Sequence, residues 1–213
     1  MTLLPSPEVL AAFTLAAIVL IVTPGPDMAL FLGQTLTAGR ARGLAAMLGV
    51  TTGTVLHSLI AAFGLSALLA ASVVAFTALR IAGVAYLIWL AIGALRHGSA
   101  FNLRREGGGK RPLRQVYLMG LGCNLLNPKV IMFFVTFLPQ FVSASDPQAG
   151  PKLLFLGLYF VALALPICAS LVFAAERFTA AIRRSQRLTR AIDWLFAGLM
   201  GMFAVRLLFW RAD

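Results

Sequence analysis

Charged residues are scarce in this chain, and acidic residues are the scarcest. Charged side chains make up 12% of the 213 residues and only 7 are Asp or Glu, whereas a soluble domain carries about 25% charged residues. Apolar residues make up 60%, more than a soluble globule of this size could bury. These proportions exclude a conventional cytosolic enzyme and a disordered protein, and they indicate a polytopic membrane protein.

Cysteine is nearly absent as well. Cys123 and Cys168 both lie in apolar runs and have no metal-ligand spacing, so we expect two buried thiols without a disulfide. The chain also lacks the signatures of nucleic-acid recognition modules, any nucleophile–base–orienter set and an H-E-x-x-H motif. We therefore expect no nucleic-acid partner, no catalytic residues, no bound metal and no cofactor.

Six apolar stretches are long enough to cross a membrane, which takes about 20 residues. They are residues 8–38, 43–71, 73–95, 116–142, 153–175 and 191–210. The first, second and fourth are so long that we expect tilt, a kink or a break in each. The fold class predicted is an all-α integral membrane protein with six transmembrane helices in a single domain, residues 1–213.

Basic residues gather in three connections between these stretches. Residues 39–42, 96–115 and 176–190 hold most of the 18 Lys and Arg. Because connections rich in Lys and Arg stay in the cytoplasm, we expect both termini on the outer, periplasmic side. The net charge of +11 is thus interpreted as an orientation signal beside a lipid bilayer.

The Gly-rich basic linker 96–115 divides the chain into two halves of three spans, about 1–95 and 116–213. Landmarks recur in both halves: Pro24 and Pro128, Gly49 and Gly157, Ala82-Gly83 and Ala197-Gly198. Because each half has an odd number of spans, the halves must run in opposite directions. Such inverted repeats are typical of secondary transporters.

Proline interrupts the first and fourth spans near their middle, at Pro24, Pro26 and Pro128. Proline lacks an N–H and clashes with the preceding turn, so each helix must open there. We expect Asp27 to cap the second half of the first span, and Asn127 to cap that of the fourth, with Pro128 as its first helical residue. Discontinuous helices at matching places in two halves indicate a transport site.

Asp27 and Lys129 are the only formal charges near the centre of any span, where a charge costs at least about 2.5–3.5 kcal/mol. A structural interpretation is that Asp27 caps its half-helix while Lys129 pairs with Asp27 or bonds loose carbonyls. In a functional interpretation, both also face a polar cavity that binds a zwitterion. Lys129 and a half-helix N-terminus would hold the carboxylate; Asp27, able to exchange a proton, and opened carbonyls would hold the ammonium.

Other polar residues belong to the same hypothesis. His57 is a second candidate for proton coupling, with a satisfied interior histidine as the alternative. Asn124 shares a helix face with Asn127, and Gly49-x-x-x-Gly53 predicts close helix packing within the protein in preference to dimerisation. The predicted substrate-binding residues are Thr23, Pro24, Gly25, Pro26, Asp27, Asn124, Asn127, Pro128 and Lys129.

The motifs T-P-G-P-D at 23–27, G-x-x-x-G at 49–53 and N-P-K at 127–129, followed by Phe133-Phe134 and Leu138-Pro139-Gln140-Phe141, resemble those of the LysE/RhtB family of amino-acid exporters. The resemblance covers essentially the whole chain. It implies a permease of the bacterial inner membrane that exports amino acids or close derivatives, driven by the proton motive force. Family members differ in substrate, and these motifs do not choose among amino acids.

Two alternatives of related architecture stay open. A metal-ion exporter needs several converging oxygen or imidazole ligands, and the span interiors offer Asp27, His57 and Asn side chains. A transmembrane thiol-redox carrier needs facing cysteines beside the breaks, where Cys123 lies next to the second break and the first has none. For an exporter, the partners are the amino acid and protons; a homo-oligomer is allowed, although no residue specifies one.

Overall fold

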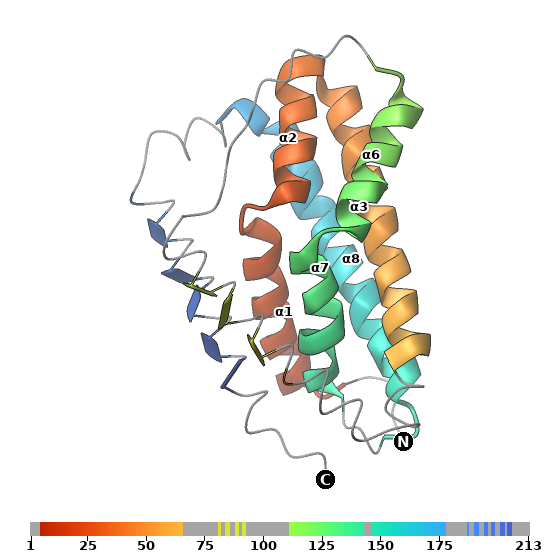
Figure 1. The fold of residues 1–213 in the computed structure, drawn as a ribbon, viewed down its shortest axis with the longest axis vertical. Helices are drawn as coiled ribbons and strands as arrows, with labels where there is room; N and C mark the ends of the chain where they lie inside the picture. Colours follow the sequence, from red (N-terminus) through yellow and green to blue (C-terminus); the bar gives the residue numbers. More distant parts are fainter. Residues whose placement is uncertain are drawn as a thin grey trace.

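The computed structural model describes residues 5–65, 111–142 and 146–177, with single helical positions and pairs between 81 and 92 and between 187 and 205. Every described element is helical (Figure 1). Most of the predicted third and sixth spans, residues 96–110 of the predicted linker and both termini lie outside the described residues. The orientation of the termini and the Ala-Gly landmarks as a pair therefore stay predictions.

The two proline-interrupted spans are broken as predicted. Helices α1 (Pro7–Val22) and α2 (Pro26–Ala38) meet at a bend of 50°. Helix α6 (Leu113–Leu125) is followed by α7 (Pro128–Met132), the π-helical turn η2 (Phe133–Phe137) and the 3₁₀ turn η3 (Leu138–Phe141), with a bend of 49°. Each bend lies at a proline that removes a helical hydrogen bond.

Two helices are unbroken and long enough to cross a membrane. They are α3 (Arg40–Ile60), which continues into the π-helical turn η1 (Ala61–Leu65), and α8 (Ala149–Phe173). With each bent pair counted as one span, the described helices supply four candidate spans. Apolar side chains such as Leu15, Ile60 and Phe63 stay exposed on the outside of the bundle, as lipid-facing residues would.

The described helices run in two opposite directions (Figure 1). The pair α1–α2 runs opposite to α6–α7, and α3 runs opposite to α8. Helices α3 and α6 lie side by side and parallel, because Arg42 Nε donates to Arg111 O at one end and His57 contacts Asn124 at the other. The first and fourth spans are therefore antiparallel, as are the second and fifth.

Glycine lets α3 and α6 approach backbone to backbone. A Cβ atom on Gly49 would lie 2.0 Å from Tyr117 O, and one on Gly120 would lie 2.1 Å from Ala46 O. Real Cβ atoms cannot occupy such positions, because interiors are already close-packed. The predicted internal packing at Gly49-x-x-x-Gly53 is confirmed.

Two apolar clusters lie on either side of the breaks. One is built on aromatic rings, among them Phe13 against Phe141 with ring centroids 5.2 Å apart and Phe133 against Phe160 at 4.7 Å. The other contains Met28, Phe31, Leu32, Met47 and Val172. The polar residues of the breaks are thus enclosed between two apolar layers.

The contact between α3 and α6 yields a stability prediction. We expect Gly49→Ala to destabilise the protein by about 1–3 kcal/mol, because the added Cβ forces two helix backbones apart. Gly122→Ala on α6 is the matched control, since its Cβ would meet nothing within 4 Å. Thermal unfolding in detergent measures both; a Gly49→Ala melting temperature equal to or above that of Gly122→Ala would contradict the packing described.

Candidate functional site

Lys129 completes the first break from the opposite half of the chain. In a continuous helix the N–H of residue 24 would bond the carbonyl of Leu20, but Pro24 has no N–H. Lys129 Nζ instead donates to Leu20 O at 2.9 Å and to Thr23 O at 2.7 Å. The prediction that Lys129 bonds loose carbonyls is confirmed.

The ammonium of Lys129 lies directly over Gly25. A Cβ on Gly25 would lie 3.6 Å from Lys129 Nζ, which is an ordinary van der Waals contact. The glycine between the two prolines therefore borders the lysine site as well as forming part of the break.

His57 has the corresponding place at the second break. Pro128 removes the N–H that would bond Asn124 O, and that carbonyl accepts instead from Asn127 N at 3.1 Å. His57 Nε2 lies 3.4 Å from the same oxygen. A carbonyl oxygen only accepts, so Nε2 carries the hydrogen in this contact. Lys129 and His57 thus each approach the carbonyl that a proline has deprived of its helical partner.

The capping predictions have different outcomes. Asn127 caps α7 as predicted, because its Oδ1 accepts from Lys129 N at 3.1 Å and Pro128 follows as the first helical residue. The prediction for Asp27 is wrong: Gly25, in an extended conformation, is the N-cap of α2, and no side chain caps this helix. Pro26 takes the first helical position, which places Asp27 inside the first turn rather than before it. There the carboxylate still interacts favourably with the positive end of the helix.

Asp27 reaches instead across to the other break. Its Oδ2 accepts a hydrogen bond from Asn124 Nδ2 at 2.7 Å. Its Oδ1 is buried and has no hydrogen-bond partner among the described residues. One carboxylate oxygen is therefore anchored, while the other is available for a proton or a cationic group.

Asn124 packs against Gly53, and Asp27 sets the orientation of its amide. Asn124 is fully buried, and its Oδ1 lies 2.5 Å from where a Cβ of Gly53 would be. Flipping the amide would place its carbonyl oxygen next to the Asp27 carboxylate. Two hydrogen-bond acceptors would then face each other, which is unfavourable. The amide therefore keeps its donor toward Asp27, and Gly53 on α3 becomes a supporting residue of the site.

A cavity of about 80 Å³ lies between the two breaks, several times the roughly 10–15 Å³ that one water needs. All four described spans contribute to it. Of the predicted substrate-binding residues, six line the cavity: Thr23, Gly25, Asp27, Asn124, Asn127 and Lys129. Pro24, Pro26 and Pro128 do not line it and act by opening the helices.

His57 also lies outside the cavity lining. It is buried, and its ring stacks on Phe134 with centroids 5.6 Å apart. Its connection to the cavity runs through the carbonyl of Asn124, whose side chain holds Asp27. From the sequence, His57 could be identified as an ionisable residue inside a predicted span. Its contact with the carbonyl of Asn124 could not be predicted.

Much of the apolar part of the cavity wall was not predicted. Helix α8 contributes Phe160, Val161, Ala164 and Cys168, and no polar residue in that stretch distinguished it from a lipid-facing helix. Thr51 and Thr54 line the cavity and also donate to their own helix, at Met47 O and Val50 O. The remaining lining residues are Leu20, Ile21, Met28, Phe31, Met47, Val50 and Val130.

Within the part of the chain that the structure describes, no group of three or more His, Cys, Asp or Glu gathers as a metal site would require. Cys123 and Cys168 are both free thiols. The described residues therefore provide no support for the metal-exporter alternative or the thiol-carrier alternative.

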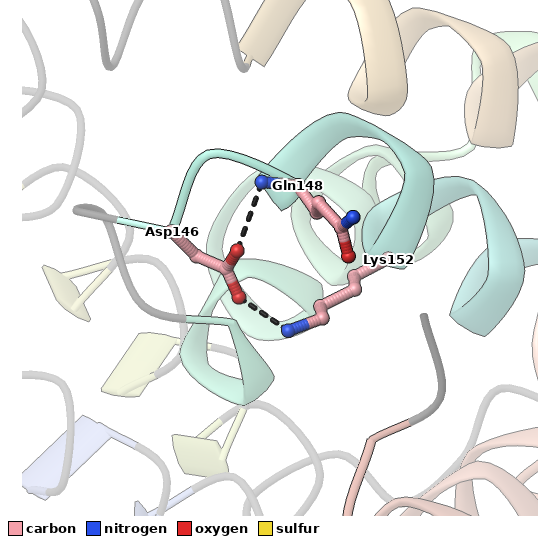
Figure 2. Close-up of polar contacts among 3 residues, drawn as sticks. All are labelled: Asp146, Gln148 and Lys152. Carbon is pink, nitrogen blue, oxygen red and sulfur yellow. Dashed lines mark hydrogen bonds and ion pairs between the residues drawn. The ribbon is translucent and has the colours of Figure 1, made fainter. Parts of the chain in front are cut away.

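A second carboxylate, outside the spans, contrasts with Asp27. Asp146 precedes α8, and its two oxygens accept from Gln148 N at 2.8 Å and from Lys152 Nζ (Figure 2). The hydrogen bond from the Lys152 side chain, followed by that from Gln148 N, holds the pKa of Asp146 below its ordinary value. Asp146 therefore stays ionised at neutral pH, with both oxygens partnered.

Comparison with known proteins gives consistent matches. The family model for LysE type translocators matches residues 18–210. An uncharacterized membrane protein of Pseudomonas aeruginosa is 32% identical over 195 residues, which cover 87% of this chain and 90% of that protein. A homoserine/homoserine lactone efflux protein of Salmonella typhimurium is 28% identical over 88% of this chain and 90% of its own. A leucine efflux protein of Enterobacter is 27% identical over 92% of each chain. No solved structure matches.

The histidine contact at the second break can be tested by stability. We expect His57→Phe to lower the unfolding free energy by about 0.5–1.5 kcal/mol, because phenylalanine keeps a ring against Phe134 but donates nothing to Asn124 O. His57→Gln retains a donor and should recover part of the loss. Thermal unfolding in detergent checks both; equal stability of wild type and His57→Phe would show that the contact contributes nothing.

Proposed function

The chain belongs to the family of LysE type translocators, and from this premise we propose that it exports amino acids across the bacterial inner membrane in exchange for protons. The names of two relatives, which describe efflux of homoserine, homoserine lactone and leucine, support amino-acid export. The cavity between the two breaks is the transport site in this proposal. Its dimensions and mixed polarity suit a small zwitterion.

The observation that carries the proposal is the unpartnered Oδ1 of Asp27. A buried carboxylate oxygen without a hydrogen-bond donor is costly to leave ionised, so it favours either a proton or a cationic ligand. A proton and the ammonium of an amino acid would compete for this oxygen. Because one displaces the other, the same group can release a proton to the cytoplasm on loading and accept one from outside on release.

The carboxylate of the substrate would be held on the other side of the break. Lys129 provides a positive charge beside Gly25, and the N-terminus of α2 has no side-chain cap. The backbone N–H groups of Asp27 and Met28 in the first turn of α2 are suitable donors for an anion. The remaining predicted residues, Asn124 and Asn127, would position Asp27 and α7.

The wider architecture belongs to the proposal as well. Six spans in two inverted three-helix halves would place the two breaks face to face, and the opposite directions of α1–α2 and α6–α7 support this arrangement. Alternating access would rock the halves and open one apolar cluster at a time. The basic connections would lie in the cytoplasm and both termini outside, following the positive-inside rule.

Of the two residues predicted for proton coupling, Asp27 has the more direct role in this proposal. It lines the cavity, whereas His57 contacts the carbonyl of Asn124 behind it. Asp27 would exchange its proton with the substrate ammonium, and His57 would affect that exchange through Asn124. This division makes Asp27 the residue to test first.

We expect Asp27→Asn to abolish proton-coupled efflux, with a loss of about 100-fold or more, because an amide cannot exchange a proton. The measurement is efflux of amino acids from proteoliposomes, with and without an acidic external solution. In the wild type an acid outside should accelerate efflux. Asp146→Asn is the matched control: it removes a carboxylate outside the spans and should leave efflux unchanged.

Efflux by Asp27→Asn at the wild-type rate, with the same acceleration by acid, would place proton coupling elsewhere. Loss of activity in Asp146→Asn as well would make the effect of Asp27→Asn unspecific. Monodisperse gel filtration of both variants establishes that each is folded.

A further inference from the structure

The cavity has a polar end and an apolar wall, and this asymmetry limits the substrate. Its charged lining residues are Asp27 and Lys129, one of each sign. In the proposed function, on which this inference rests, these two charges serve the ammonium and the carboxylate that every amino acid carries. Among the described lining residues no third charge remains for the side chain.

The wall formed by α8 offers no nitrogen or oxygen side-chain atom. Phe160, Val161, Ala164 and Cys168 lie one helical turn apart on the face that lines the cavity. Opposite them, α2 and α3 contribute Met28, Phe31, Met47 and Val50. Side chains of this kind favour aliphatic ligand groups through burial of apolar area.

The hydroxyl groups at the cavity are already committed as donors. Thr23, Thr51 and Thr54 donate to Val19 O, Met47 O and Val50 O, respectively. The Asn127 carbonyl oxygen is engaged in capping α7, and the Asn124 amide nitrogen donates to Asp27. Asn124 Oδ1 has no hydrogen-bond partner among the described residues, but it is a neutral acceptor and supplies no counter-charge. A charged substrate side chain would therefore be buried without a counter-charge, which is strongly unfavourable.

We infer that the α8 face of the cavity is the side-chain subsite and that it selects neutral amino acids with aliphatic side chains, such as leucine, isoleucine, valine and methionine. Basic and acidic amino acids are disfavoured because the described lining residues offer no third charge to pair with a charged side chain. Ala164 lies at the middle of this face, between Phe160 and Cys168. Its small side chain sets the room available to the substrate side chain.

The first test is exchange of radiolabelled leucine in proteoliposomes loaded with a single unlabelled amino acid. Leucine, isoleucine, valine and methionine should support exchange, whereas lysine, arginine and glutamate should support at least about 100-fold less. Exchange with lysine or glutamate comparable to leucine would overturn this inference and leave the proposed export intact. Absence of exchange with every amino acid would overturn this inference, because labelled leucine would then not be a substrate; efflux of each amino acid from singly loaded proteoliposomes tests the proposed export separately, and efflux of none would overturn that proposal.

The second test uses two substitutions on the same helix. Ala164→Phe fills the subsite and should lower leucine efflux by about 10-fold or more while changing alanine efflux by less than about 3-fold. Ala162→Phe is the matched control, because Ala162 is exposed on the outside of the bundle and both substrates should move at the wild-type rate. Monodisperse gel filtration of both variants establishes that each is folded.

Equal losses of leucine and alanine efflux in Ala164→Phe would show that Ala164 does not discriminate by side-chain size, which would overturn its role in the subsite. Unchanged efflux of both would do the same, by showing that α8 does not border the substrate. Only a loss selective for leucine supports the assignment.

Discussion

A backbone carbonyl inside a membrane must find a donor, and proline removes the donor that a helix would normally supply. Pro24 leaves Leu20 O without its helical partner, and Pro128 does the same to Asn124 O. Lys129 donates to the first carbonyl and His57 approaches the second. Each break is thus contacted by a residue from the other half of the chain. Lys129 supplies the donor that Leu20 O has lost, and His57 adds to the hydrogen bond that Asn124 O already accepts from Asn127 N.

These contacts connect the charged residues of the cavity to the helix breaks that form it. Asp27 follows one break and is anchored by Asn124, which precedes the other. Gly53 leaves the space that the Asn124 amide occupies, and Lys129 passes over Gly25 on its way to the carbonyls. A change of charge at Asp27 would therefore act on groups that hold both breaks in place. Coupling between a proton and a movement of the halves needs a link of this kind.

Features with a local cause could be predicted from the sequence. The breaks follow from proline itself, the cap of α7 from Asn127-Pro128, and the close contact of α3 and α6 from spaced glycines. The N-cap of α2 was wrongly assigned to Asp27, because α2 begins at Pro26 and Gly25 is its N-cap. The contact of Asn124 with Asp27, the approach of His57 to a carbonyl and the α8 wall could not be predicted. They depend on which faces of helices distant in the sequence pack together. Hydropathy alone does not specify these faces when the helices are apolar all round.

The central claim is that the Asp27 carboxylate exchanges a proton for the ammonium of the substrate. The most direct measurement is proton release on leucine binding, followed with a pH indicator in weakly buffered, mildly acidic detergent solution. Leucine should release protons from the wild-type protein and none from the Asp27→Asn variant. Leucine binding without proton release, or release that persists in Asp27→Asn, would contradict the account.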